Sequence, residues 1–290
     1  MGGLIGRQTV ARSALALVVA YLAGLYYSGA YTLLNPASCM LMRGEAIVEQ
    51  PVRLANLTAR LTAEAVSYVG RATATPDPYL LYMAFHKTHT ALFSSPHFEG
   101  AVDTEYGDNL AELDWAVGQI LGAIDRGGRA SNTLILFASD NGGWVERGAD
   151  GGSNGPFRGG KAQIYEGGIR VPGIIRWPAR LSGPRNITAP ISTLDLMPTL
   201  LEVLRLSPPP ADGPRALDGK SIAGLLSDNA PAGLDASPHD FLFQYCGTAV
   251  HAVRHGRHKV LYATPIVDEG TEGCFETFGC GCEDKVGLVW

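Results

Sequence analysis

Two short apolar runs, each followed at once by polar residues, constrain this chain more than any other feature. Residues 79–85 (YLLYMAF) lead into the polar sequence HKTH, and residues 133–138 (TLILFA) lead into SDNGG. Between them, residues 107–125 carry apolar side chains at helical spacing until Gly127 and Gly128 end the pattern. A strand, a helix and a second strand connected in this way predict parallel pairing, with polar residues at the carboxyl ends of the strands.

Three further segments extend this pattern on either side. Residues 44–70 have leucines and an alanine at spacings of three and four, which predicts a helix. Residues 171–177 read as another strand. Residues 191–204 read as a helix, in which Pro198 requires either an early helical position or a kink. A long glycine-rich loop is expected at residues 142–168.

The last part of the chain has a different character. Residues 207–240 are rich in proline, glycine and small polar residues and read as a linker. Three short strands are predicted after it, at residues 241–246, 249–254 and 259–263. Together they suggest a small antiparallel sheet. The predicted fold class is α/β, a mixed or parallel sheet flanked by helices, with this antiparallel sheet added. We divide the chain into a hydrophobic segment, an α/β domain and a small subdomain, at residues 1–35, 36–235 and 236–290.

The amino-terminal segment is apolar and uncharged from residue 13 to residue 34, after Arg7 and Arg12. Its length is sufficient for a helix to cross a bilayer, and its tyrosines suit the membrane interface. A signal peptide and a buried core helix are the alternatives. We expect membrane association, with the rest of the chain delivered to a lumen.

The cysteines and sequons point to the same compartment. Four of the five cysteines lie close together near the carboxyl end, where disulfides are favoured over a zinc site because the spacing fits no common zinc pattern: Cys246, Cys274, Cys280 and Cys282. Cys39 is left over, either as a free thiol or with a partner outside this chain. Asn56 and Asn186 begin N-x-T sequons and are glycosylation candidates. These features predict the secretory pathway, with a catalytic part in the lumen of the endoplasmic reticulum, Golgi or lysosome.

The charge pattern excludes one class of partner. The net charge is -5 and charged residues make up 18% of the chain. Because clusters of Lys and Arg that would neutralise phosphates are missing, we expect no nucleic-acid partner.

The residues that follow the two apolar runs are the main candidates for chemistry. Asp140 and Asn141 place a carboxylate beside an amide oxygen, a pair suited to Ca²⁺ or Mg²⁺, although an Asx turn has the same sequence. His86 and His89 follow the earlier run. A histidine there can act as a general acid or hydrogen-bond donor, and a purely structural histidine is the alternative.

The glycine-rich segment at residues 151–161 ends in Lys161. Its backbone amides and the lysine charge suit an anion, while a flexible loop with a solvated lysine is the alternative. It is not a Walker A motif, because Ala162 follows the lysine. Glu166 and Arg170 are positioned to pair and brace the next turn, or Arg170 is solvated. A hard-metal pair, a histidine and a lysine at neighbouring strand ends together indicate an anion-ester hydrolase, provided that their side chains converge.

Several of these segments resemble the later signature blocks of sulfatases. The resemblance covers roughly residues 36–285 and is strongest for the group of steroid sulfatases and arylsulfatases. It rests on HTALFSS at 89–95, AELDW at 111–115, SDNG at 139–142, GGK at 159–161, YEGGIRVPGIIRWP at 165–178 and LDLMPTLLEV at 194–203.

The resemblance implies an alkaline-phosphatase-like fold and hydrolysis of a sulfated small molecule or glycan. It implies that Asp140 and Asn141 bind Ca²⁺, that Lys161 holds a sulfate oxygen, and that His89 lies near the leaving-group oxygen. His86 would be structural. This chemistry is consistent, since a cation and a lysine stabilise charge that builds on the sulfate oxygens while a histidine protonates the departing oxygen.

The chain also departs from the family pattern. Sulfatases use a formylglycine made from the cysteine of a C-x-P-x-R motif, and this sequence has no such motif. The early Asp-Asp metal pair of the family has no counterpart either, and two ligands fall short of the six to eight oxygens usual for Ca²⁺. We therefore expect a fragment that is inactive alone. The alternatives are a non-catalytic pseudoenzyme fragment and a phosphate-ester hydrolase of the same superfamily, which normally has more histidine and aspartate for two metals.

Overall fold

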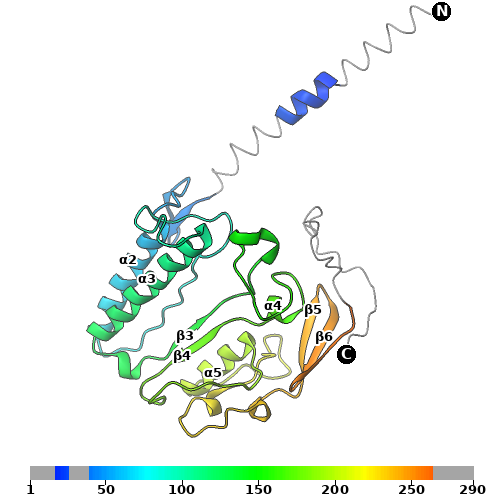
Figure 1. Ribbon diagram of the computed structural model, residues 1–290. Coiled ribbons are helices and arrows are strands. Elements are labelled where there is room, and N and C mark those ends of the chain that lie inside the picture. Colours follow the sequence, from blue (N-terminus) through cyan, green and yellow to red (C-terminus); the bar gives the residue numbers. More distant parts are fainter. Residues whose placement is uncertain (1–16, 26–38, 264–290) are drawn as a thin grey trace, which may run out of the picture.

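The computed structural model describes residues 17–25 and 39–263 (Figure 1). Residues 17–25 form an exposed helical segment. Within the described ranges, no helix is both long and apolar enough to cross a membrane. The rest of the predicted membrane segment lies outside the described residues.

The chain from residue 39 begins with a β-hairpin, which corrects the predicted helix at 44–70. Strands β1 (Leu41–Arg43) and β2 (Ala46–Glu49) pair antiparallel, and helix α2 runs only from Leu57 to Thr73. The turn between the strands contains Gly44, whose φ of 59° is a conformation that glycine adopts readily. The regular leucine spacing is therefore helical only in its later half.

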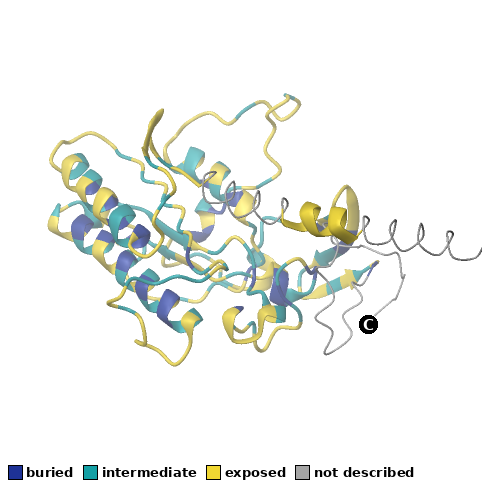
Figure 2. Ribbon diagram, turned by 90° about the horizontal axis from the view of Figure 1, so that it is seen from above, coloured by how far each residue is buried: buried dark blue, intermediate teal, exposed yellow. Residues whose placement is uncertain are grey.

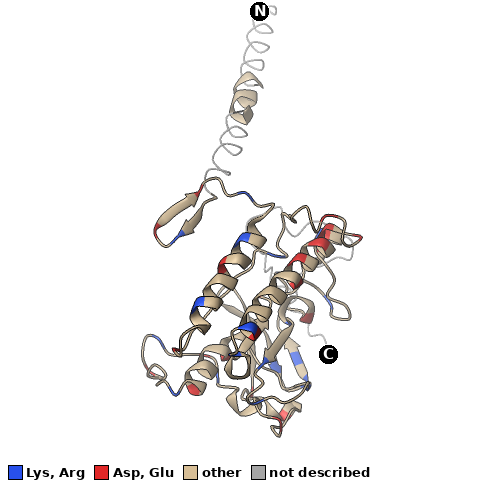
Figure 3. Ribbon diagram, turned by 90° about the vertical axis from the view of Figure 1, so that its left-hand side faces the viewer, with Lys and Arg blue, Asp and Glu red and all other residues tan. Residues whose placement is uncertain are grey.

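Helix α2 packs against α3 (Glu105–Arg126), and the two run in the same direction, with their carboxyl ends together (Figure 1). The core between them is formed by Ala65, Val69, Ile120, Ala123 and Ile124. Figure 2 shows the buried positions on the facing sides of these helices. The predicted helix at 107–125 and its end at Gly127 are confirmed, since the Gly127 amide donates to the Ala123 carbonyl. Acidic residues gather at the start of α3, where they face the positive end of the helix dipole (Figure 3).

The apolar run at residues 79–85 is extended, with alternate side chains turned inward. Leu81, Met83 and Phe85 pack on the helical core, while Leu80 and Tyr82 are exposed. The predicted parallel strand pairing is wrong for the described residues, because this run has no ladder hydrogen bonds and the later strand pairs elsewhere. A single side-chain bond, from the Tyr79 hydroxyl to Thr133 Oγ1 at 2.9 Å, links it to the start of the next apolar run.

That next run forms strand β3 (Ile135–Ala138), after the short 3₁₀ helix η1 (Ala130–Asn132). It pairs antiparallel with β4 (Gly173–Arg176), so both strands were predicted at the right places. The glycine-rich loop between them contains the 3₁₀ helix η2 (Val145–Asp150) and the short helix α4 (Glu166–Ile169).

The helix predicted at residues 191–204 is present in two parts. The 3₁₀ turn η3 (Thr193–Asp195) opens with a capping box between Ser192 and Asp195, and α5 (Leu196–Val203) follows. Pro198 lies in the first turn of α5, where the missing amide hydrogen is tolerated. Asp195 is fully buried and accepts a hydrogen bond from His239 Nε2 at 2.7 Å.

The predicted linker at residues 207–240 is packed rather than free. It contains the 3₁₀ turns η4 (Ala223–Leu225) and η5 (Leu234–Ala236), and Ile222 and Leu225 are buried against Ala189. The small antiparallel sheet that follows is confirmed. Its strands are β5 (Leu242–Cys246), β6 (Ala249–His255) and β7 (His258–Leu261), paired in that order.

The cysteines and sequons have the following surroundings. Cys246 is disulfide-bonded, and Cys39 is a free, exposed thiol. Cys274, Cys280 and Cys282 lie outside the described residues. Asn56 precedes α2 and Asn186 lies in a loop, and both are exposed, as a glycan requires.

Candidate functional site

The Asp-Asn pair follows the end of β3 directly. Asp140 is exposed, and within the described part of the chain its carboxylate has no hydrogen-bond or ion-pair partner. The side-chain amide of Asn141 donates to the Gly142 carbonyl at 2.9 Å, which leaves the amide oxygen as an acceptor. The local geometry is thus partly that of a turn, as the alternative reading held, yet it leaves two hard oxygen donors available.

Backbone hydrogen bonds bring the lysine loop to this pair. The Gly142 amide donates to the Gly168 carbonyl at 3.0 Å, and the Lys161 amide donates to the Gly143 carbonyl at 2.9 Å. Only glycine fits at position 142, because a Cβ there would lie 1.7 Å from the Gly167 carbonyl oxygen. Asp140, Asn141 and Lys161 are therefore carried by two loop segments that are bonded to each other.

Asn154 holds the same junction together, although no motif in the sequence singles it out. Its side chain accepts from the Gly143 amide at 2.8 Å and donates to the carbonyls of Gly143 and Gly159 at 2.9 and 3.0 Å. A polar residue inside a glycine-rich loop is too common to be recognised in advance. Lys161 itself is half-buried, and its Nζ lies 5.8 Å from the centre of the Trp144 ring.

His89 lies on a separate loop, between residues 86 and 95. Its side chain is exposed, and its Nδ1 is hydrogen-bonded to the Thr90 carbonyl. His86 is also exposed, and its carbonyl accepts from the His89 amide at 3.1 Å. The loop that carries both histidines is fastened to α3 from within.

Lys87 and Glu112 provide this fastening, and sequence reasoning missed both. Lys87 Nζ lies 3.0 Å from Glu112 Oε2, and each side chain is only 1% exposed. The same ammonium donates to Asn109 Oδ1 at 3.0 Å and to the Phe93 carbonyl, and Glu112 also accepts from the Ser95 amide. Burial lowers the pKa of Lys87, although Glu112 opposes the shift. A lysine between two histidines in HKTH gives no sign that it is buried.

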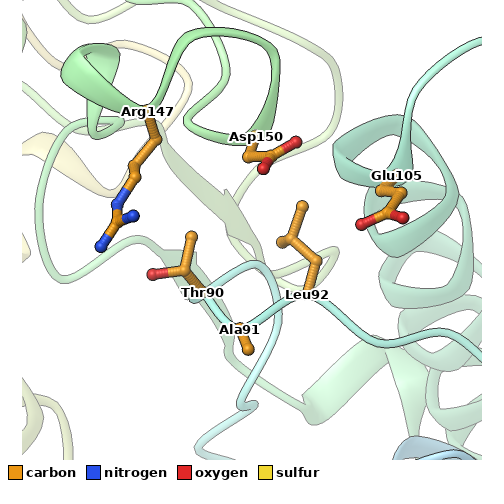
Figure 4. Close-up of a pocket in the computed structure, with 6 residues that line it drawn as sticks. All are labelled: Thr90, Ala91, Leu92, Glu105, Arg147 and Asp150. Carbon is orange, nitrogen blue, oxygen red and sulfur yellow. The ribbon is translucent and has the colours of Figure 1, made fainter.

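A pocket of about 450 Å³ lies between the two loops (Figure 4). Thr90, Ala91 and Leu92, which follow His89, line one side, and Arg147 and Asp150 of η2 line another. Glu105 at the start of α3 completes the wall, with its carboxylate on the same side of the pocket as that of Asp150 in Figure 4. The pocket therefore joins the histidine loop to the loop that carries Lys161.

The described residues are only a partial match to a metal site. Among them, no three side chains from His, Cys, Asp and Glu are grouped to hold an ion. The oxygen donors of Asp140 and Asn141 fit a hard cation in kind, but two donors are fewer than Ca²⁺ normally takes. The structure thus joins the predicted metal pair to Lys161 and sets His89 beside a pocket shared with the same loop.

Comparison with known proteins decides what this arrangement belongs to. The model of the family described as "Sulfatase" matches residues 25–206, which is more than half of the chain. The chain belongs to the sulfatase family. A second model, described as the C-terminal region of aryl-sulfatase, matches residues 237–288. The resemblance seen in the sequence is therefore confirmed.

The relatives of this sulfatase chain include steryl-sulfatases and arylsulfatases. Human steryl-sulfatase is 41% identical over 86% of this chain and 43% of its own length. Human arylsulfatase H is 38% identical over 93% of this chain and 49% of its own length. The chain thus spans less than half the length of these relatives.

Solved structures agree with the fold. The PsFucS1 sulfatase from Pseudoalteromonas sp. matches with a TM-score of 0.67 and 26% identity, over 76% of this chain and 44% of that one. Ps i-CgsB in complex with a neocarrahexaose matches with a TM-score of 0.60 and 28% identity, over 71% of this chain and 46% of that one. The predicted alkaline-phosphatase-like α/β fold class is confirmed, as is the small antiparallel carboxyl-terminal sheet. Proteins of this family use a metal ion.

Proposed function

We propose that this chain carries the carboxyl-terminal part of the active site of a sulfate-ester hydrolase of the arylsulfatase and steroid-sulfatase type. One observation carries the proposal: the paired backbone hydrogen bonds from Gly142 to Gly168 and from Lys161 to Gly143. They fix two oxygen donors and a lysine on adjoining loops, in a chain 41% identical to human steryl-sulfatase. Anion-ester chemistry requires this combination of a cation site and a fixed positive charge.

In this proposal Asp140 and Asn141 hold a calcium ion, which when bound would draw charge from the sulfate oxygens. The remaining calcium ligands would come from polypeptide outside this chain, from substrate or from water, because two donors are too few. Lys161 binds a sulfate oxygen through its ammonium group, and its partial burial strengthens that attraction.

His89 acts on the other side of the ester bond. Its Nδ1 is bonded to the Thr90 carbonyl, which favours the tautomer with hydrogen on Nδ1 and leaves Nε2 for the leaving-group oxygen. The pocket beside it would hold the alcohol or phenol part of a sulfated small molecule or glycan. The protonated imidazole would give its proton to the departing oxygen as the S–O bond breaks.

The nucleophile is absent from this proposal, because the sequence has no C-x-P-x-R motif. We infer that the chain alone does not turn over sulfate esters. The sequons at Asn56 and Asn186 and the disulfide at Cys246 support a lumenal location in the secretory pathway. The apolar residues 13–34 would attach the protein to the membrane there.

A chimera tests the proposal. Residues of this chain replace the matching carboxyl-terminal part of human steryl-sulfatase, and hydrolysis of an aryl sulfate is measured with and without calcium. We expect calcium-dependent hydrolysis that falls at least about a hundredfold in Asp140→Ala and Lys161→Ala, because each removes a charge that stabilises the transition state. Asp218→Ala, which changes an exposed carboxylate elsewhere, is the matched control.

Three results would count against the proposal. Hydrolysis of the aryl sulfate by the unmodified 290-residue chain would disprove the inference that the chain alone lacks the nucleophile. A folded but inactive chimera would favour the pseudoenzyme. Faster hydrolysis of an aryl phosphate than of the aryl sulfate would favour the phosphate-ester alternative.

A further inference from the structure

The strongest cluster of charges outside the proposed site is centred on Glu166, the first residue of α4. Its Oε1 accepts from Arg254 at 2.7 Å and from Lys259 Nζ at 3.0 Å, and its Oε2 accepts from Arg170 at 3.0 Å. The predicted pairing of Glu166 with Arg170 is therefore formed, but two further cations join it. Both of these come from the carboxyl-terminal sheet.

Arg254 and Lys259 reach Glu166 as a matched pair. They are cross-strand partners in β6 and β7, and their side chains are 14% and 9% exposed. Two cations opposite each other on a hairpin repel, so the Glu166 carboxylate between them offsets this repulsion within the sheet. The same carboxylate ties the sheet to the loop that carries it. Lys259 Nζ also donates to the Ile164 carbonyl, two residues before Glu166. Figure 1 shows the sheet lying beside α4.

The other side of α4 is bonded to the proposed site. The Gly168 carbonyl accepts from the Gly142 amide, next to Asn141, and the Gly167 amide donates to the Arg158 carbonyl at 2.8 Å, in the segment that leads to Lys161. The backbone segments are tightly packed at these contacts. A Cβ on Gly167 would lie 2.0 Å from a backbone oxygen, and a Cβ on Gly168 would lie 2.2 Å from one. A shift of α4 would therefore move both loops.

We propose that Glu166 is a positioning residue, through which the carboxyl-terminal sheet fixes the loops that carry Asp140, Asn141 and Lys161. The role of those loops rests on the proposed function, whereas the mechanical link does not. Burial by itself would raise the pKa of Glu166, but hydrogen bonds from Arg254 and Lys259 outweigh it and lower the pKa to about 2. The carboxylate is thus charged throughout the physiological range.

Hydrogen exchange of the full chain, followed by mass spectrometry, tests the link without substrate or metal. In Glu166→Gln we expect amides of residues 139–168 to exchange at least about tenfold faster, because charge-assisted hydrogen bonds to the loop are lost. Amides of α2 and α3 should keep their wild-type rates. Glu64→Gln on α2, which removes an exposed ion pair with Arg43 of β1, is the matched control and should leave the exchange of residues 139–168 unchanged.

A second pair of variants covers the case in which Glu166→Gln does not fold. Arg254→Ala should reproduce the faster exchange, and Arg254→Lys, which keeps a cation on the sheet, should restore most of the protection. Unchanged exchange at residues 139–168 would overturn the proposal, and so would equally faster exchange in α2 and α3, which would show a global loss of stability. Because neither outcome depends on hydrolysis, failure of the positioning role and failure of the sulfatase proposal can be told apart.

Discussion

Replacing Glu112 by Gln should destabilise the fold strongly, although the substitution hardly changes the shape of the side chain. The carboxylate is 1% exposed and lies 3.0 Å from the equally buried ammonium of Lys87. The change removes the compensating negative charge and leaves the buried ammonium with neutral oxygens alone, those of Asn109, Phe93 and the new amide. Removing one member of a buried ion pair costs about 3 to 5 kcal/mol.

Urea unfolding followed by tryptophan fluorescence measures this cost. With an m-value of about 2 to 3 kcal/mol per molar for a domain of this size, the midpoint should fall by about 1 to 2 M. The double variant Lys87→Met with Glu112→Leu should recover part of the loss, because no buried charge remains uncompensated. The Ser95 amide and the Phe93 and Asn109 oxygens lose a partner in it, so recovery should not be complete. Glu64→Gln should barely move the midpoint, since its ion pair with Arg43 is exposed.

The expected order of the urea midpoints is Glu64→Gln highest, the double variant next and Glu112→Gln lowest. It is wrong if Glu112→Gln matches Glu64→Gln, because the buried charge would then have found other compensation. It is also wrong if the double variant is less stable than Glu112→Gln. An unchanged m-value across the series is needed for the midpoints to report stability alone.

Two other outcomes follow from contacts described above. The pKa of Glu166 is about 2, against an ordinary 4.5, so its contribution of about 3 kcal/mol to stability should be complete above pH 4.5 and lost as the pH falls toward 2. Urea midpoints measured from pH 6 to pH 3 should therefore fall less steeply in Glu166→Gln than in wild type. Parallel curves for the two proteins would contradict this expectation. Gly142→Ala should destabilise the chain by at least about 2 kcal/mol, because its Cβ would overlap the Gly167 carbonyl oxygen. Gly118→Ala on the exposed side of α3, where the Cβ meets nothing, should instead stabilise the chain by about 1 kcal/mol. Thermal unfolding that ranks Gly142→Ala as the more stable variant would contradict this expectation.

Local patterns in the sequence predicted the elements that depend on local interactions. Helix α3, with its apolar spacing and closing glycines, lies within two residues of the expected bounds. The three strands of the carboxyl-terminal sheet were also found, because they are short runs separated by tight turns at Gly247 and Gly256. The helix expected from residue 44 failed because periodicity does not show where a helix begins, and Gly44 permits a hairpin turn there.

Long-range contacts were harder to predict. The run at residues 79–85 has the composition of a buried strand, yet pairing depends on neighbours that the run itself does not specify. The same holds for the site. The proposed roles of Asp140, Asn141 and Lys161 rest on motifs that can be read in the sequence, whereas Lys87 and Glu112 are recognised only from their contact with each other in the structure. No local pattern marks such residues.

The contacts of Glu166 have a consequence for synthesis on the ribosome. Lys259 lies 93 positions after Glu166, so the nascent chain exposes the whole lysine loop long before its anchors are translated. A premature stop codon between these two residues would leave every predicted catalytic and metal-binding side chain in the product. That product would still lack the hairpin that holds those side chains in place, so the presence of the motifs in a shortened transcript is no sign of a working enzyme.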